Sequence, residues 1–144
     1  MGKQLSIRVG AFEAITQAEK KQKARGDVMD YSQLSDRDID AQVLHKIYGN
    51  QGNDKDIMRS WLRGGFKYTT NPAESWPIIQ ENGISINHYN GVWEASFEWD
   101  APVGAFGTDE TVTTSTEHKN PLRAAMVAYL MMCEVSNVQT DSTR

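Results

Sequence analysis

The chain has 144 residues, the length of one domain with a sizeable core, and its formal net charge of -4 argues against general binding to nucleic-acid phosphates. No apolar run reaches transmembrane length and the N-terminus lacks the hydrophobic core of a signal peptide, so we expect a cytoplasmic protein without membrane contact. Cys133 is the single cysteine, which excludes an intramolecular disulfide and a cysteine metal cluster.

Residues 1–28 differ from the rest of the chain in charge, because six lysines and arginines stand there against three acidic residues. We predict a basic, mobile or loosely docked arm at this end. A single α+β domain is expected over residues 29–135, followed by a polar tail at 136–144. An arm that binds nucleic acid is the alternative interpretation of residues 1–28.

The first helix of the domain is expected between a capping-box pattern at Ser35 to Asp38 and a terminating Gly49. Apolar residues at helical spacing mark one side only: Ile39, Val43, Leu44 and Ile47. This predicts a short, one-sided helix that covers a surface.

Residues 50–70 carry a weaker signal, with a plausible helical turn at 57–62 in an otherwise irregular connection. Long connections in small domains often carry binding loops. Arg59, Arg63, Lys67 and Tyr68 are therefore candidate binding residues, and a plain solvated loop is the alternative.

A second helix is expected to begin at Asn71 and Pro72, with Glu74 favouring the helix dipole. Pro77 lies beyond the first turn and removes a hydrogen bond. We expect a short or kinked helix that ends at residues 82–83.

Three strands should follow. Residues 84–89 and 92–99 alternate in polarity around Asn90 and Gly91, the strongest two-residue hairpin signal. A long loop is expected at 100–109 and a polar edge strand at 111–116. In the second strand, one face carries the aromatic residues and should pack on helices, while Glu94 and Glu98 lie on the other.

The last helix is predicted over residues 120–133, beginning at Asn120 and Pro121, and it is apolar almost all round. Arg123 lies in its first turn. A solvated arginine or an ion pair with Glu117 would explain it, and so would an anion such as phosphate held by Arg123 and the free backbone N–H groups. The resulting order α-α-β-β-β-α favours an α+β fold with an antiparallel sheet of three or more strands and helices on its faces.

Catalysis receives no support from the residues. The three histidines stand on different elements without metal-site spacing, and no phosphate loop or nucleophile elbow is present. We predict neither enzymatic activity nor a cofactor. Tyr48 and Trp61 flank expected loops and are candidates for stacking on a base, with Arg123 at a helix start to meet phosphate.

Three segments occur together in this sequence: DYSQLSD at 30–36, NPAESWPII at 71–79 and NPLRAAM at 120–126. In this combination the chain resembles the NinX-like family of small phage proteins over residues 30–133, a family without an established activity. The layout also resembles the phage ABA-sandwich domain, which includes the Thoeris anti-defence sponges. Those homo-oligomers bind cyclic ADP-ribose signals and related cyclic nucleotides without cleaving them.

The sponge resemblance implies that Arg123 contacts phosphate and that the segment around Tyr48 and Gly49 lines the same pocket. Asn50 stands where those sponges tend to have a tryptophan, so the chain departs from their pattern at a base-stacking position.

We therefore predict a non-catalytic, homo-oligomeric phage accessory protein in the host cytoplasm that sequesters a small phosphate-containing ligand, such as a cyclic nucleotide or cyclic ADP-ribose signal. The predicted ligand-binding residues are Arg123, Asn120, Tyr48, Asn50, Trp61, Arg59 and Arg63. Two alternatives remain: a module that docks on a host or phage protein, and a nucleic-acid-associated factor that uses the basic arm.

Overall fold

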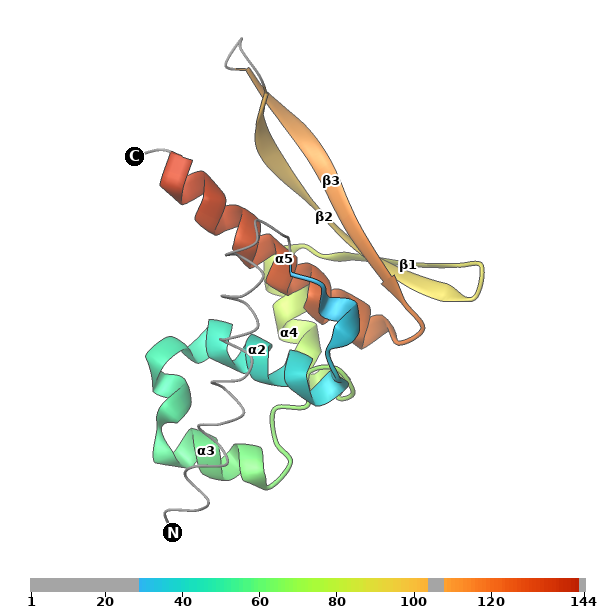
Figure 1. Cartoon of the computed structure of the whole chain (residues 1–144). Helices are drawn as coiled ribbons and strands as arrows, with labels where there is room; N and C mark the ends of the chain where they lie inside the picture. Colours follow the sequence, from blue (N-terminus) through green and yellow to red (C-terminus); the bar gives the residue numbers. More distant parts are fainter. Residues whose placement is uncertain (1–28, 104–107, 143–144) are drawn as a thin grey trace. The chain divides into compact units, whose positions relative to one another are not determined.

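The computed structural model describes residues 29–103 and 108–142, which belong to two compact units that divide between Lys67 and Tyr68 (Figure 1). Each unit is described by itself. The basic arm predicted at residues 1–28 lies outside the described residues.

The first unit contains a 3-10 turn η1 (Tyr31–Gln33), helix α2 (Asp36–Tyr48), a second 3-10 turn η2 (Gly49–Asn53) and helix α3 (Lys55–Leu62). The predicted capping box begins α2. The Ser35 hydroxyl accepts from the Asp38 backbone N–H at 3.1 Å, and the Asp38 carboxylate accepts from the Ser35 backbone N–H at 3.1 Å. Asp therefore performs here the role that Glu or Gln usually has.

Helix α2 is buried on all sides at its centre. Residues 39–44 are buried in succession, Asp40 and Gln42 among them, and six successive residues go more than once around a helix. The prediction of a one-sided helix is therefore wrong. The apolar pattern missed this because two of the enclosed side chains are polar.

Helix α3 is a complete element where the sequence indicated only a turn. The Asp54 carboxylate accepts from the Asp56 backbone N–H at 2.9 Å and so caps the helix start. Met58 is its single buried residue. Three helices rather than two consequently precede the strands.

The second unit begins with α4 (Pro72–Asn82), which the Asn71 side chain caps by accepting from the Ala73 backbone N–H at 3.1 Å. The helix continues past Pro77 and ends at Gly83, as the sequence predicts. Gly83 is left-handed with φ of 64°, and beyond it the Ile84 backbone N–H returns to the Ile79 carbonyl at 3.1 Å.

The sheet consists of β1 (Ser85–Tyr89), β2 (Val92–Val103) and β3 (Thr108–His118), antiparallel and in the order β1-β2-β3. Tyr89 pairs with Val92 around Asn90 and Gly91, whose φ angles are positive, so the predicted hairpin is confirmed.

The second hairpin is longer than the sequence suggests. β2 and β3 stay paired out to Val103 and Thr108, which places most of the predicted 100–109 loop in the ladder. Backbone pairing thus extends past Pro102, a residue that weakens the sequence signal for a strand.

Helix α5 (Pro121–Ser142) packs against β2 and β3, and α4 packs against α5 (Figure 1). Ala95 and Phe97 of β2 are buried on the face that α5 covers. Residues 123–128 of α5 are buried in succession, and the helix extends well beyond its predicted end at Cys133.

The predicted α+β class, with a three-stranded antiparallel sheet and packed helices, is confirmed, and the order is α-α-α-β-β-β-α. None of the described helices is both long and apolar enough to cross a membrane.

The left-handed end of α4 can be tested at Gly83. Gly83→Ala should lower the free energy of unfolding by about 1 kcal/mol, because a Cβ is strained at this φ even though no atom stands within 4 Å of it. Gly83→Asn should recover about half of that loss, since asparagine tolerates the left-handed region. Urea unfolding followed by circular dichroism measures both; equal losses for the two variants would contradict this account.

Candidate functional site

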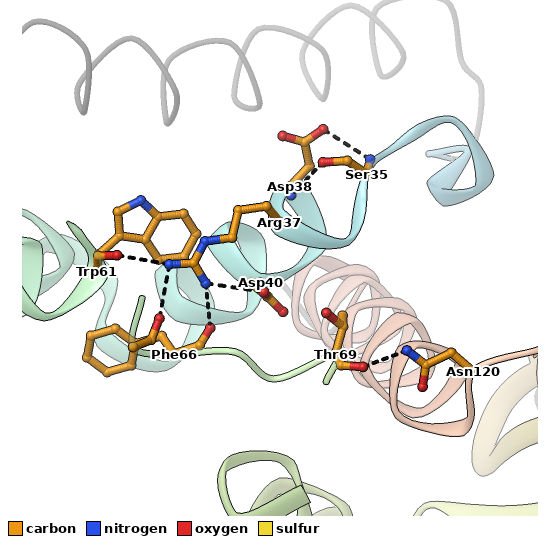
Figure 2. A network of polar contacts seen from close by, with 9 residues as sticks. Ser35, Arg37, Asp38, Asp40, Trp61, Phe66, Thr69 and Asn120 are labelled. Carbon is orange, nitrogen blue, oxygen red and sulfur yellow. Dashed lines mark hydrogen bonds and ion pairs between the residues drawn. The ribbon is translucent and has the colours of Figure 1, made fainter. Parts of the chain in front are cut away.

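Arg37, in the first turn of α2, joins the two helices of the first unit. Its guanidinium donates to the carbonyl oxygens of Trp61 at 2.9 Å, Gly65 at 3.0 Å and Phe66 at 3.3 Å, and forms a 3.3 Å ion pair with Asp40 (Figure 2). These carbonyls lie at the end of α3 and in the turn that follows. The Trp61 carbonyl also accepts from the Gly64 backbone N–H at 3.0 Å, so the guanidinium is a second donor to it, and its positive charge interacts favourably with the negative end of the helix dipole.

The same guanidinium lies over the Trp61 ring, with its central carbon 3.5 Å from the ring centroid. Arg37 therefore occupies one face of the indole that the sequence suggested for stacking on a base. Tyr48, the other stacking candidate, meets Phe66 edge-on with ring centroids 6.0 Å apart. Both aromatic residues contribute to packing within the unit.

The turn after α3 is tightly constrained. A Cβ on Gly65 would stand 2.9 Å from the Ser60 carbonyl oxygen, so the position accepts only glycine without a shift. Phe66 next to it has φ of 60°, which is uncommon for a large side chain. Because the carbonyls of both residues accept from Arg37, that side chain holds the turn in a conformation it would not choose alone.

The remaining predicted residues of the first unit lie at its surface. Asn50 is exposed within η2, and Arg63 is exposed at the end of α3. Arg59 is exposed and forms a 3.6 Å ion pair with Asp56. These side chains are accessible, but no described contact draws them together with Tyr48 or Trp61.

In the second unit, Asn120 organises the start of α5. Its side-chain oxygen accepts from the backbone N–H groups of Leu122 at 3.0 Å and Arg123 at 3.4 Å, and its amide donates to the Thr69 carbonyl at 2.6 Å (Figure 2). Two N–H groups that the sequence made available to an anion are thereby satisfied. The interpretation of Arg123 as a solvated side chain is wrong, because only 7% of it is exposed.

The seven predicted ligand-binding residues thus divide between the units, five in the first and two in the second. A pocket that needs both sets stays a prediction.

A different surface stands out in the second unit, the side of the sheet opposite α5, which we call the outer face. Among the residues whose side chains the structure describes, strand alternation and the pairing register assign twelve to it. They are Ser85, Asn87, Tyr89, Val92, Glu94, Ser96, Glu98, Asp100, Thr111, Thr113, Ser115 and Glu117. Most are exposed, four are carboxylates and none is basic.

Two of these carboxylates are direct cross-strand neighbours, since Glu94 pairs with Glu117 in the register. Like charges in that position destabilise a sheet. The Tyr89 hydroxyl lies against both, 3.0 Å from Glu94 and in close contact with Glu117. Its bonds to Glu117 and then to Glu94 raise the pKa of Tyr89 well above its usual value. The single Tyr89 hydroxyl group is therefore the hydrogen-bond donor to both carboxylates.

The outer face belongs to an acidic part of the chain. Residues 68–142 contain ten aspartates and glutamates but only two basic residues, Lys119 and Arg123. The whole-chain charge of -4 conceals this segregation. The sequence placed Glu94 and Glu98 on one face of a strand, and counting charges along the chain would have shown the wider segregation as well.

Catalytic or metal-binding geometry is not seen in the described residues. Within them, no group of three or more His, Cys, Asp and Glu side chains is placed to hold a metal ion. The rings of His88 and Trp93 are tilted by 47° to each other, with their centroids 4.7 Å apart. The His118 ring accepts from the Asn120 backbone N–H at 2.9 Å. Cys133 is half-buried. Burial of Tyr129, together with the neighbouring Cys133 thiol, raises the pKa of Tyr129 to about 12.

The family model that describes bacteriophage P22 NinX matches residues 30–133, most of the chain. The chain belongs to this family. The resemblance to the NinX-like family is confirmed, which makes the chain a phage accessory protein, while the resemblance to the anti-defence sponges stays a prediction. The matched range contains Arg37, Asn120 and the whole outer face. No curated protein and no solved structure matches the chain.

Arg37 offers a test of the first unit. Arg37→Ala should lower the free energy of unfolding by about 2 kcal/mol, because it removes the hydrogen bonds of the guanidinium to three backbone carbonyls and its ion pair with Asp40. Arg37→Lys should recover less than half of the lost stability, since an ammonium group cannot donate to these separate acceptors at once as the planar guanidinium does. Thermal and urea unfolding provide the measurement.

Arg59→Ala is the matched control, since it removes an exposed arginine whose ion pair should contribute about 0.5 kcal/mol or less. If Arg37→Ala and Arg59→Ala cost the same, the stabilising role of the Arg37 contacts is refuted.

Proposed function

We propose that this phage accessory protein is non-catalytic and acts by docking the outer face of its sheet on a positively charged surface of another protein. The observation that carries the proposal is an exposed sheet face with four carboxylates and no basic residue. Such a face attracts a cationic partner over distance and repels nucleic acid and acidic proteins.

The spacing of the charges suits a protein surface better than a small molecule. At about 3.3 Å per strand residue, Glu94 and Glu98 are separated by about 13 Å and Asp100 lies about 7 Å further along. Glu117 stands beside Glu94 on the next strand. An array of this length matches several lysines or arginines spread over a partner.

The outer face also carries one aromatic side chain, Tyr89, at the hairpin end of the edge strand β1. Tyr89 is 39% exposed between Glu94 and Glu117, and tyrosine is among the residues that contribute most to protein interfaces. Serine and threonine supply much of the remainder, so few bulky side chains stand in the way of a partner. Charge and one aromatic side chain are thus combined on a single accessible surface.

An oligolysine peptide provides a cationic probe of this face. Its titration into the isotope-labelled protein should shift the amide resonances of β1, β2 and β3 above those of the helices. Neutralising Glu94, Glu98 and Asp100 together, to Gln, Gln and Asn, should weaken binding at low salt by at least about tenfold. Nuclear magnetic resonance and fluorescence anisotropy measure the two effects.

A second triple variant controls for net charge. Asp36→Asn, Asp56→Asn and Glu81→Gln remove three exposed carboxylates that lie on helices. This variant should bind oligolysine within about twofold of the natural chain. Equal losses in the two triple variants would show that overall charge, and not the outer face, attracts the probe.

The second candidate function is sequestration of a small phosphate-containing ligand, such as a cyclic nucleotide or a cyclic ADP-ribose signal. The observation in its favour is Arg123, an enclosed guanidinium in the first turn of α5 and one of only two basic residues within residues 68–142. Homo-oligomerisation and a place in the host cytoplasm accompany this proposal. A nucleic-acid role through residues 1–28 falls outside the described residues.

Thermal melting against cyclic nucleotides, cyclic ADP-ribose isomers and inorganic phosphate tests the second candidate. A ligand at 100 times its dissociation constant adds about 2.7 kcal/mol, a shift of about 3 °C or more. Arg123→Lys should lose the shift and Lys119→Ala should keep it. No shift with any of these compounds in the natural chain would remove the candidate, and an altered compound recovered afterwards would show catalysis instead.

A further inference from the structure

Strand β3 forms an open edge of the sheet. The order β1-β2-β3 places it at one side, and within the described part of the chain its backbone pairs only with β2. It is 11 residues long. In an antiparallel sheet, alternate residues of an edge strand point their N–H and C=O groups away from the neighbour, so β3 presents a long row of unpaired donors and acceptors.

The centre of this edge lacks the features that usually protect one. Residues 111–116 read Thr-Val-Thr-Thr-Ser-Thr, which is strongly β-prone and free of charge, proline and glycine. Pairing with β2 runs without interruption from Trp93 and His118 to Val103 and Thr108, so no bulge turns the edge aside. The described charged and titratable side chains stand only toward its ends, at Glu110, Glu117 and His118.

We propose that β3 pairs antiparallel with β3 of a second copy of this chain, centred on Thr114, to form a symmetric six-stranded sheet. In this register Thr114 faces its own counterpart, Thr113 faces Ser115 and Val112 faces Thr116. Glu110 then lies opposite His118 of the second copy, once at each end of the pairing. Strand β3 can therefore pair with a second copy of itself, because residues 111–116 carry no charge and Glu110 meets His118 at each end.

Neighbouring registers fit less well. Centring on Thr113 brings position 109, an aspartate in the sequence, opposite Glu117, and like charges directly opposite are destabilising. Centring on Ser115 shortens the paired segment, since β3 ends at His118. In the Thr114-centred register, each residue pairs with a residue from the same face of the sheet in the second copy. The outer faces of the two copies would therefore form one continuous surface. This inference is independent of the docking and ligand proposals.

The first test is the concentration dependence of mass in sedimentation velocity with the full chain. The natural chain should form dimers as its concentration rises. Thr113→Lys with Ser115→Lys places lysines opposite lysines across the two-fold axis and should raise the dimer dissociation constant at least about tenfold. Far-UV circular dichroism checks that each variant is folded.

Ser85→Lys with Asn87→Lys is the matched control, because it adds the same charge to the outer face at the opposite edge of the sheet. This pair should dimerise as the natural chain does. A natural chain that stays monomeric up to about 0.2 mM, or equal loss in both lysine pairs, overturns the proposal.

A charge swap tests the register. His118→Glu places a glutamate opposite Glu110 of the second copy and should weaken the dimer about as much as the β3 lysine pair. Adding Glu110→Arg should restore the dissociation constant to within about threefold of the natural chain, because an arginine then lies opposite the introduced glutamate and the repulsion is removed. A double variant as weak as His118→Glu alone overturns the Thr114-centred pairing.

Discussion

The first unit depends on one cation that reaches three backbone carbonyls. The last turn of any helix leaves carbonyl groups without an internal partner, and the turn after α3 adds two more acceptors in a constrained backbone. Arg37 donates to one carbonyl of that last turn, Trp61, and to both acceptors of the following turn, and it covers the Trp61 ring as well. Arg37 lies within the capping box of α2, between Ser35 and Asp38, which fix where that helix begins. A local start signal thus positions a side chain that orders a segment far along the chain.

The local signals predicted much of the fold. The caps at Ser35, Asn71 and Asn120, the left-handed Gly83 and the Asn90–Gly91 hairpin each depend on a few adjacent residues, and each is present. Features that depend on distant partners were missed. The enclosure of α2 includes two polar residues, and the contacts of Arg37 join segments more than 20 residues apart, so no periodicity could reveal them.

The candidate site was harder to predict for a related reason. Residue type suggested that aromatic rings and arginines would face a ligand, but type alone does not say whether a partner within the fold already occupies them. Trp61 meets Arg37, Tyr48 meets Phe66, and Asn120 satisfies the N–H groups that follow it. The outer face escaped attention because its charges are separated in sequence, and only the register of β2 with β3 makes neighbours of Glu94 and Glu117.

That pair of carboxylates has a consequence for the energetics of recognition. A free protein that keeps two like charges in contact, with a single Tyr89 proton between them, is less stable than its backbone pairing alone would allow. A cation that arrives from outside relieves the repulsion, so affinity and folding stability become thermodynamically linked. In the docking proposal, association with a cationic partner would therefore recover stability that the isolated chain loses at this pair of carboxylates.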